Sequence, residues 1–155
     1  MNLIVACDSN YGIGKNNMLP DWNIPGDLKR FKDLTTGNGD NVVIMGKNTF
    51  LSLPKGPLPK RTNIIVSKTL NTNDKYIVIN NLKEAYDYAN KLISCNSNSK
   101  IWLIGGAQIY EEAIKLNLIK EAYVTKLNDT FDCDTYLGKL TIEWIESKDS
   151  IVYYF

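Results

Sequence analysis

Residues 101–110 read IWLIGGAQIY, in which a short apolar run meets two glycines and then a helical pattern. The run at residues 101–104 predicts a strand that is buried on both faces. Gly105 and Gly106 would let the backbone approach a ligand, and the N-terminus of the helix that follows favours a phosphate group. The sequence is not G-x-G-x-x-G, because Gln108 stands near the place of a third glycine. A tight strand-to-helix turn without a ligand is the alternative.

The rest of the chain alternates between predicted strands and helices, which favours an α/β fold with a mostly parallel sheet. Further strands are predicted at residues 3–7, 41–45, 62–67, 76–79 and 121–127. Helices are predicted at residues 24–34, 48–53, 82–93 and 107–116. Residues 141–145 and 151–155 indicate an antiparallel hairpin around residues 148–150. We expect one domain over residues 1–155, with a mostly parallel central sheet of about eight strands, an antiparallel C-terminal strand and about four flanking helices.

The composition is that of a globular protein, with 155 residues of which 44% are hydrophobic and 23% are charged. The 18 basic and 17 acidic residues leave a net charge of +1, so no broad basic field favours nucleic acid. No apolar run is long enough to cross a bilayer, and the N-terminus lacks the features of a secretory signal. We expect a monomer with no nucleic-acid or membrane partner.

Two residue types limit the chemistry. The chain has no histidine, which excludes Ser-His and Cys-His nucleophiles and the common zinc sites that contain histidine. Acid–base chemistry must then use Asp, Glu, Tyr, Lys or water, and no metal site is predicted. Three cysteines, Cys7, Cys95 and Cys133, are odd in number and far apart, which suits a reduced, cytoplasmic protein.

Residues 8–23 have no periodic pattern, although they lie between a predicted strand and a predicted helix. A loop of this length is uncommon in a compact domain and is usually functional or disordered. The loop contains Gly12 and Gly14, and the apolar residues Leu19 and Trp22. Apolar residues in a polar loop suggest a lid that closes over a ligand.

Asp27 falls within the apolar face of the helix predicted at residues 24–34, for which Pro25 marks the start and Gly37 the end. A carboxylate among apolar residues is costly without a partner. The alternative is a first-turn carboxylate that stabilises the helix through its free N–H groups and dipole. That alternative does not require the apolar face, which consists of Ile24, Leu28, Phe31, Leu34 and Thr35.

Lys47 and Lys68 each follow a predicted strand closely. Because ligands of α/β sheets bind at the carboxyl ends of strands, two lysines there would suit a phosphate group. The alternative is ordinary surface charge. Residues 41–48 are not a P-loop, because Asn41 and Asn48 replace residues that the motif requires.

Four blocks of the chain together resemble dihydrofolate reductase. They are GIGKNNMLPDWNIPGDLKRFK at residues 12–32, VVIMGKNTFLSLP at 42–54, PLPKRTNIIVS at 57–67 and IWLIGGAQIYEEAI at 101–114. The similarity runs over residues 3–155, and the blocks follow the order of the family. It implies NADPH-dependent reduction of 7,8-dihydrofolate to 5,6,7,8-tetrahydrofolate in one-carbon metabolism, with hydride transfer to C6 and protonation of N5. Dihydrofolate and antifolate inhibitors would be the small-molecule partners.

The resemblance also implies roles at the substrate end of the site. Asp27 would be the active-site carboxylate that binds the N3 and 2-amino edge of the pterin, and Thr125 would hydrogen-bond to it. Trp22 would hold water near the ring, and the N5 proton would arrive through water admitted near Trp22 and Leu19. Arg61 would bind the α-carboxylate of the glutamate tail. The other residues implied for the substrate are Ile4, Val5, Phe31, Leu53, Leu58 and Ile104.

For NADPH, the resemblance implies three groups of residues and a cis peptide between Gly105 and Gly106. Those beside the nicotinamide would be Ala6, Ile13 and Leu19. Those that hold the adenosine half and its 2′-phosphate would be Gly46, Lys47, Thr49, Ser67 and Lys68. Those around the pyrophosphate would be Gly105, Gly106, Ala107, Gln108 and Ile109. The other residues implied for the cofactor are Gly14, Asn48, Ile104 and Tyr110.

The chain departs from the family in a few places. Lys47 stands where Arg is frequent, which keeps the charge but loses a bidentate fork. Asp21 is an insertion relative to bacterial forms, and the final hairpin is short. A pyrimidine reductase of riboflavin synthesis shares the fold, but it lacks the helix that carries an Asp beside a Trp. A catalytically silent nucleotide-binding module is the other alternative, and the retained lid, Asp27 and Arg61 oppose it.

Overall fold

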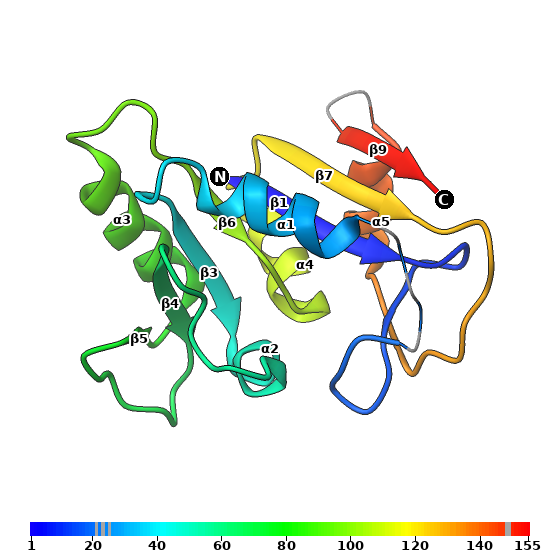
Figure 1. The fold of residues 1–155 in the computed structure, drawn as a ribbon, viewed down its shortest axis with the longest axis horizontal. Helices are drawn as coiled ribbons and strands as arrows, with labels where there is room; N and C mark the ends of the chain where they lie inside the picture. Colours follow the sequence, from blue (N-terminus) through cyan, green and yellow to red (C-terminus); the bar gives the residue numbers. More distant parts are fainter. Residues whose placement is uncertain (21, 23, 25, 148–149) are drawn as a thin grey trace.

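The computed structural model describes residues 1–20, 22, 24, 26–147 and 150–155. Seven strands form one sheet in the order β5-β4-β3-β6-β1-β7-β9 (Figure 1), and every neighbouring pair is parallel. Their bounds are β1 Asn2–Cys7, β3 Val42–Gly46, β4 Thr62–Val66, β5 Ile77–Ile79, β6 Ile101–Leu103, β7 Glu121–Lys126 and β9 Ser150–Tyr154. The predicted α/β fold with a mostly parallel sheet is therefore confirmed.

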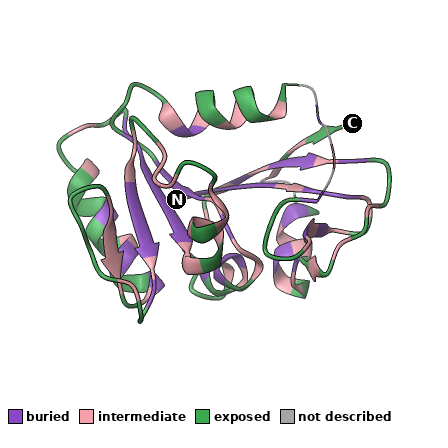
Figure 2. Cartoon of the chain, turned by 60° about the horizontal axis from the view of Figure 1, so that its bottom comes forward, coloured by how far each residue is buried: buried purple, intermediate pink, exposed green. Residues whose placement is uncertain are grey.

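The described residues contain five helices, where about four were predicted. Their bounds are α1 Asp27–Thr36, α2 Lys47–Ser52, α3 Leu82–Ile93, α4 Ala107–Lys115 and α5 Lys139–Ile145. Figure 2 shows α1 above one face of the sheet and α3, α4 and α5 below the other. No helix of the described residues is long and apolar enough to cross a membrane.

The sheet separates two apolar layers, because successive side chains of a strand point to opposite faces. Leu3 and Cys7 of β1 pack into the layer beneath α3 and α4, and the side chain of Val5 joins them there. Ile4 points to the other face, where it clusters with Phe31 of α1. The layer beneath α1 is the one that borders the candidate site described below.

The predicted C-terminal hairpin is wrong. Residues 139–145 form α5, and β9 pairs in parallel with β7. Glu111 of α4 explains the helix, because its carboxylate accepts the backbone N–H groups of Leu140 at 3.3 Å and Thr141 at 2.8 Å. A parallel neighbour requires a crossover connection, and α5 supplies it. Lys148 and Asp149 of the predicted turn lie outside the described residues.

The only two strands that pair in an antiparallel way among the described residues are β2, Gly12–Gly14, and β8, Thr135–Tyr136. Strand β2 lies within residues 8–23, so this segment is not irregular throughout, as its sequence indicated. The antiparallel element of the fold is thus this short pair and not the C-terminal strand.

Helix α1 begins at Asp27, three residues later than predicted, and extends to Thr36. Gly26 precedes it with φ at 76°, a left-handed conformation that glycine adopts at little cost. Pro25, the predicted start signal, lies outside the described residues. Leu28, which was expected on the buried face, is 75% exposed. The other predicted strands and helices agree with the observed bounds to within one residue.

Candidate active site

Asp27 and Thr125 are joined across the gap between α1 and β7. The Thr125 hydroxyl donates a hydrogen bond to Asp27 Oδ1 at 2.9 Å. Thr125 is buried, whereas Asp27 is half-buried at the first residue of its helix. The carboxylate is therefore fixed by a partner from the sheet, although it remains accessible from the side of the lid loop.

Asp27 lines a cavity of about 110 Å³ between α1 and the loop that precedes it. The cavity brings together Leu19 and Trp22 of the preceding loop with the carboxylate. The Trp22 ring meets the edge of Phe131 at a centroid distance of 5.6 Å. Leu19 is 65% exposed, so the tip of the loop presents apolar surface to solvent. Among the described residues, the lining consists of Leu19, Pro20, Trp22, Ile24, Asp27 and Leu28.

Most of the residues implied for the substrate share the apolar layer beneath α1. This layer contains Ile4, Phe31, Leu53, Leu58 and Ile104. Val5 lies in the opposite layer, so it can only offer its backbone to this side. The carbonyl of Ile4 accepts a hydrogen bond from the Tyr110 hydroxyl at 2.7 Å. Burial raises the pKa of Tyr110, which therefore stays a neutral donor.

Arg61 lies at the far end of this layer, where its guanidinium is held by two acceptors. Nε donates to the Pro59 carbonyl at 2.8 Å, and Nη1 donates to the Thr35 hydroxyl at 2.9 Å. Burial lowers the pKa of Arg61 from its ordinary value, but arginine remains charged in proteins. Arg61 also borders a second cavity of about 240 Å³, which is lined by Arg61, Thr62, Asn63, Asn73, Asp74, Lys75, Tyr76 and Ile77.

The two glycines that follow β6 lie against the carboxyl end of β3. The Gly105–Gly106 peptide is cis, as the resemblance implied, and the Gly105 carbonyl accepts the Gly46 N–H at 2.8 Å. A Cβ on Gly105 would lie 3.2 Å from Thr49 Oγ1, so the turn is closely packed. Helix α4 begins at Ala107 with no side-chain cap, which leaves its first N–H groups available to an anion.

The residues implied for the adenosine half gather at the carboxyl ends of β3 and β4. Lys47 Nζ donates to Thr69 Oγ1 at 2.9 Å. Ser67 Oγ accepts the backbone N–H groups of Thr69 and Leu70, each at 3.1 Å. Lys68 is exposed and extends the same surface.

Other residues implied for the cofactor differ in exposure. Gln108 and Asn48 are exposed, and Ala6 and Ile13 are half-buried. Ile109 and Tyr110 are buried, so their side chains support the turn rather than face a ligand. Gly14 is buried where β2 pairs with β8.

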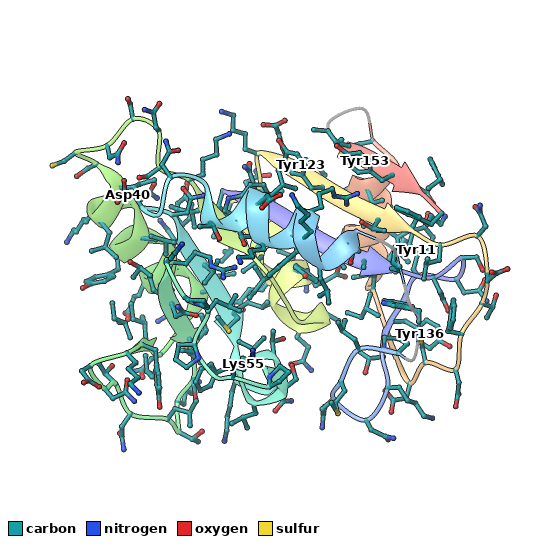
Figure 3. All side chains as sticks on the ribbon, in the orientation of Figure 1. Tyr11, Asp40, Lys55, Tyr123, Tyr136 and Tyr153 are labelled. Carbon is teal, nitrogen blue, oxygen red and sulfur yellow. The ribbon has the colours of Figure 1, made fainter. Side chains whose placement is uncertain are left out.

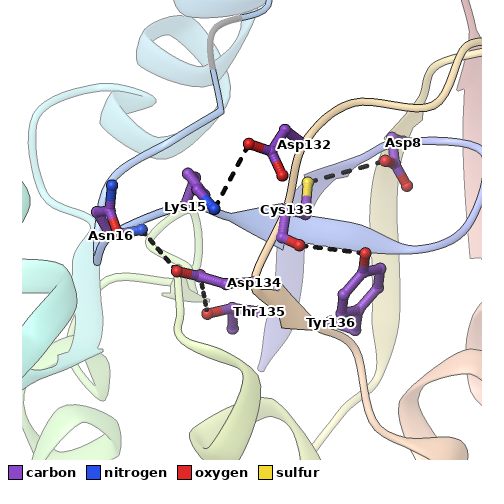
Figure 4. Close-up of polar contacts among 8 residues, drawn as sticks. All are labelled: Asp8, Lys15, Asn16, Asp132, Cys133, Asp134, Thr135 and Tyr136. Carbon is purple, nitrogen blue, oxygen red and sulfur yellow. Dashed lines mark hydrogen bonds and ion pairs between the residues drawn. The ribbon is translucent and has the colours of Figure 1, made fainter.

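Asp8 links the start of the loop at residues 8–23 to Phe131 and Cys133. Its carboxylate accepts backbone N–H groups from Asn10 at 2.9 Å, Gly12 at 2.8 Å and Phe131 at 2.9 Å. Burial alone would raise the pKa of Asp8, but these N–H groups outweigh it and hold the pKa below its ordinary value. Figure 4 shows two further links, from Asn16 N–H to Asp134 at 3.0 Å and between Lys15 and Asp132 at 3.5 Å.

The family pattern described as dihydrofolate reductase matches residues 1–152. The chain belongs to the dihydrofolate reductase family. A Caenorhabditis elegans relative is 38% identical over 154 residues, which cover 94% of this chain and 81% of the relative. The dihydrofolate reductase of Drosophila melanogaster is 39% identical over 144 residues, or 87% of this chain and 77% of the fly protein.

A third relative is longer than this chain. The bifunctional dihydrofolate reductase-thymidylate synthase of Paramecium tetraurelia is 36% identical over 138 residues, or 89% of this chain and 28% of that protein. Dihydrofolate reductases are oxidoreductases that act on a small-molecule substrate and use a nicotinamide cofactor. Membership of the family therefore supports dihydrofolate reduction as the activity.

No role was predicted from the sequence for Arg30, which the structure brings next to Thr125 and Asp27 in the candidate site. Its Nη2 donates a hydrogen bond to Thr125 Oγ1, the same atom that donates to Asp27. The sequence did contain one signal for a role of Arg30, which is its spacing from Asp27, because residues three apart on a helix are neighbours on its surface. Arg30 follows Asp27 by three residues.

Proposed function

We propose that this chain reduces 7,8-dihydrofolate to 5,6,7,8-tetrahydrofolate with NADPH, by hydride transfer to C6 and protonation of N5. The observation that carries the proposal is the Asp27 carboxylate, which Thr125 fixes at 2.9 Å and which opens on the cavity beside Leu19 and Trp22. A carboxylate with a free oxygen suits the paired N–H donors at the N3 and 2-amino edge of a pterin.

The apolar layer beneath α1 would hold the rest of the substrate. Phe31, Leu53 and Leu58 offer a wall for the pterin and aminobenzoyl rings. Arg61, fixed by Pro59 and Thr35, would bind the α-carboxylate of the glutamate tail. A planar guanidinium matches a carboxylate in two parallel hydrogen bonds, which favours an acidic tail.

Proton delivery would use water and not a side chain. Among the described residues that line the 110 Å³ cavity, Asp27 carries the single carboxylate, and it would be engaged at the N3 edge of the ring. Leu19 and Trp22 line the same cavity, so their positions control how water reaches N5. Closing the lid over the ring would exclude bulk water while the two rings are aligned.

The residues present fit a dinucleotide with a phosphate on its adenosine half. The turn at Gly105 and Gly106 has no side chains, and the uncapped N-terminus of α4 suits a pyrophosphate. Lys47 and Lys68, beside Ser67 and Thr69, would hold the 2′-phosphate, which distinguishes NADPH from NADH. When bound, NADPH supplies the hydride, and the chain orients it towards the pterin.

The direct test is the loss of nicotinamide absorbance when the purified chain receives NADPH and dihydrofolate, with tetrahydrofolate identified by mass spectrometry. Asp27→Asn keeps the shape of the side chain and removes its charge, and should lower turnover by about 10²-fold or more. Asp33→Asn is the matched control, since Asp33 lies on the same helix but pairs with Lys29 in solvent. No product from the wild-type chain, or near-native turnover of Asp27→Asn, would contradict the proposal.

A further inference from the structure

Arg30 is the one arginine beside the Asp27 carboxylate, and its contacts are unusual for a helix-surface cation. Its Nη2 donates to Thr125 Oγ1, whereas it forms no ion pair with a carboxylate among the described residues. Its Nε is buried and has no hydrogen-bond partner there. Since a buried donor without a partner costs free energy, arginine is a poor residue to choose for packing alone.

The donor from Arg30 decides where the Thr125 hydrogen points. A threonine hydroxyl has one hydrogen and accepts through its lone pairs, whereas a guanidinium can only donate. Thr125 must therefore accept from Arg30, and its own hydrogen is left for Asp27 Oδ1, 2.9 Å away. Without Arg30, the hydroxyl could turn to other acceptors, and the carboxylate would lose a fixed donor.

The C-terminal strand holds Arg30 in this position. Arg30 Cζ lies 3.8 Å from the centroid of the Tyr153 ring, within the range of a cation–π contact. Tyr153 is the register partner of Thr125 in the β7–β9 pair. Figure 3 shows Tyr153 on the edge strand β9 and Tyr123 on its neighbour β7. The guanidinium is thus confined between a tyrosine ring of β9 and the threonine of β7.

We propose that Arg30 is a positioning residue of the reductase site, which orients the Thr125 hydroxyl and through it the Asp27 carboxylate, while Tyr153 holds Arg30 in place. The inference rests on the proposed function, because it assumes that Asp27 binds the pterin. It predicts that loss of Arg30 weakens pterin binding selectively and leaves the cofactor end of the site intact.

Binding without turnover tests this selectivity. Folate affinity is measured by quenching of tryptophan fluorescence in the absence of NADPH, and NADPH affinity is measured separately by calorimetry. Arg30→Met should weaken folate binding by about tenfold, as for loss of a charge-assisted hydrogen bond, and leave NADPH binding unchanged. Arg30→Lys, which keeps a donor and the charge, should restore most of the folate affinity. Lys29→Met, which removes an exposed charge one residue earlier, should change neither affinity.

A double-mutant cycle tests the route through Thr125. If Arg30 acts by orienting this hydroxyl, Arg30→Met should add no further loss of folate affinity in a Thr125→Val background. Tyr153→Phe keeps the ring and should bind folate as the wild type does, whereas Tyr153→Leu should bind it several-fold more weakly. Both measurements use the full chain.

Three outcomes would overturn the inference while the proposed function stands. They are unchanged folate affinity in Arg30→Met, equal losses for folate and NADPH, and additive losses in the cycle. Equal losses would show that Arg30 acts through general stability, and additivity would show that it does not act through Thr125. A wild-type chain that neither binds folate nor reduces dihydrofolate would instead contradict the proposed function.

Discussion

Arg61 donates from Nη1 to the hydroxyl of Thr35 at 2.9 Å, and this hydroxyl in turn donates to the Phe31 carbonyl at 2.7 Å. The guanidinium that follows the turn at Pro59 is therefore tied to the inner face of α1, the helix that carries Asp27. The proposed sites for the pterin and for the glutamate tail therefore share one helix, and the positions of Asp27 and Thr35 along it fix their separation.

This arrangement leads to a prediction for the tail of the substrate. Arg61→Lys should raise KM for dihydrofolate about tenfold and leave kcat unchanged, since a contact far from the reacting ring is alike in ground and transition states. Lysine keeps the charge but cannot copy the planar fork. Binding of a small pterin without glutamate should hardly change. Equal losses for ligands with and without the tail would show that Arg61 acts through structure.

The lysines at the ends of β3 and β4 should set the cofactor preference. Replacing Lys47 and Lys68 with Ala should weaken NADPH binding by about tenfold or more and NADH binding far less, because only NADPH carries the 2′-phosphate. The preference of the wild-type chain should also fall as salt is added. Lys29→Ala serves as the control for charge loss at a distance. An unchanged ratio of the two affinities in the double variant would refute this assignment.

Asp8 should make stability depend on pH in a defined window. Its pKa in the folded chain lies below the ordinary value of 3.8, so its stabilising effect is present above that value and is lost as the pH falls through the folded-state pKa. Asp8→Asn should lower the free energy of unfolding by about 1–3 kcal/mol at neutral pH, and the difference should shrink in acid. Urea unfolding at several pH values measures this. Asp132→Asn, which removes an exposed carboxylate near the same loop, is the control for charge loss.

Gly12 and Cys133 should be coupled in stability. A Cβ on Gly12 would lie 2.6 Å from Cys133 Sγ and 2.8 Å from its Cβ, closer than real contacts allow. Gly12→Ala should therefore cost about 1–3 kcal/mol, and Cys133→Gly should recover much of that loss by making room. The two single variants and the double variant complete the cycle. If the losses in the free energy of unfolding are additive, residues other than Cys133 move to relieve the crowding around a Cβ at position 12.

The sequence correctly predicted the helices and strands whose patterns lie within their own residues. Helix α3 was placed correctly because its apolar residues recur with helical spacing, and the structure adds that the Asn81 side chain caps it by accepting the Glu84 N–H at 2.9 Å. Helix α5 was mistaken for a strand because its cap, Glu111, comes from another helix. The orientation of β9 depends on that helix, so the missed helix and the wrong direction predicted for the C-terminal strand have one cause.

The candidate site shows the same difference between features that the local sequence indicates and features that depend on distant residues. Asp27, Leu19 and Trp22 were expected together, and they line one cavity. Arg30 was not given a role, because nothing local indicates that Thr125, ninety-five residues away, accepts its hydrogen bond. Val5 was expected to line the pterin pocket, and because strand alternation points its side chain to the opposite layer, only its backbone is available for that role.

The central place of β1 has a consequence for the order in which the chain folds. Asn2 pairs with Trp102 on one side and with Glu121 on the other, so β1 gains its first neighbour only by closing a loop of about a hundred residues. Such distant pairings slow folding, and β1 should be among the last strands to become protected from hydrogen exchange during refolding. Because Ile4 and Ala6 lie on this strand, the chain should acquire its affinity for ligands at the same late step.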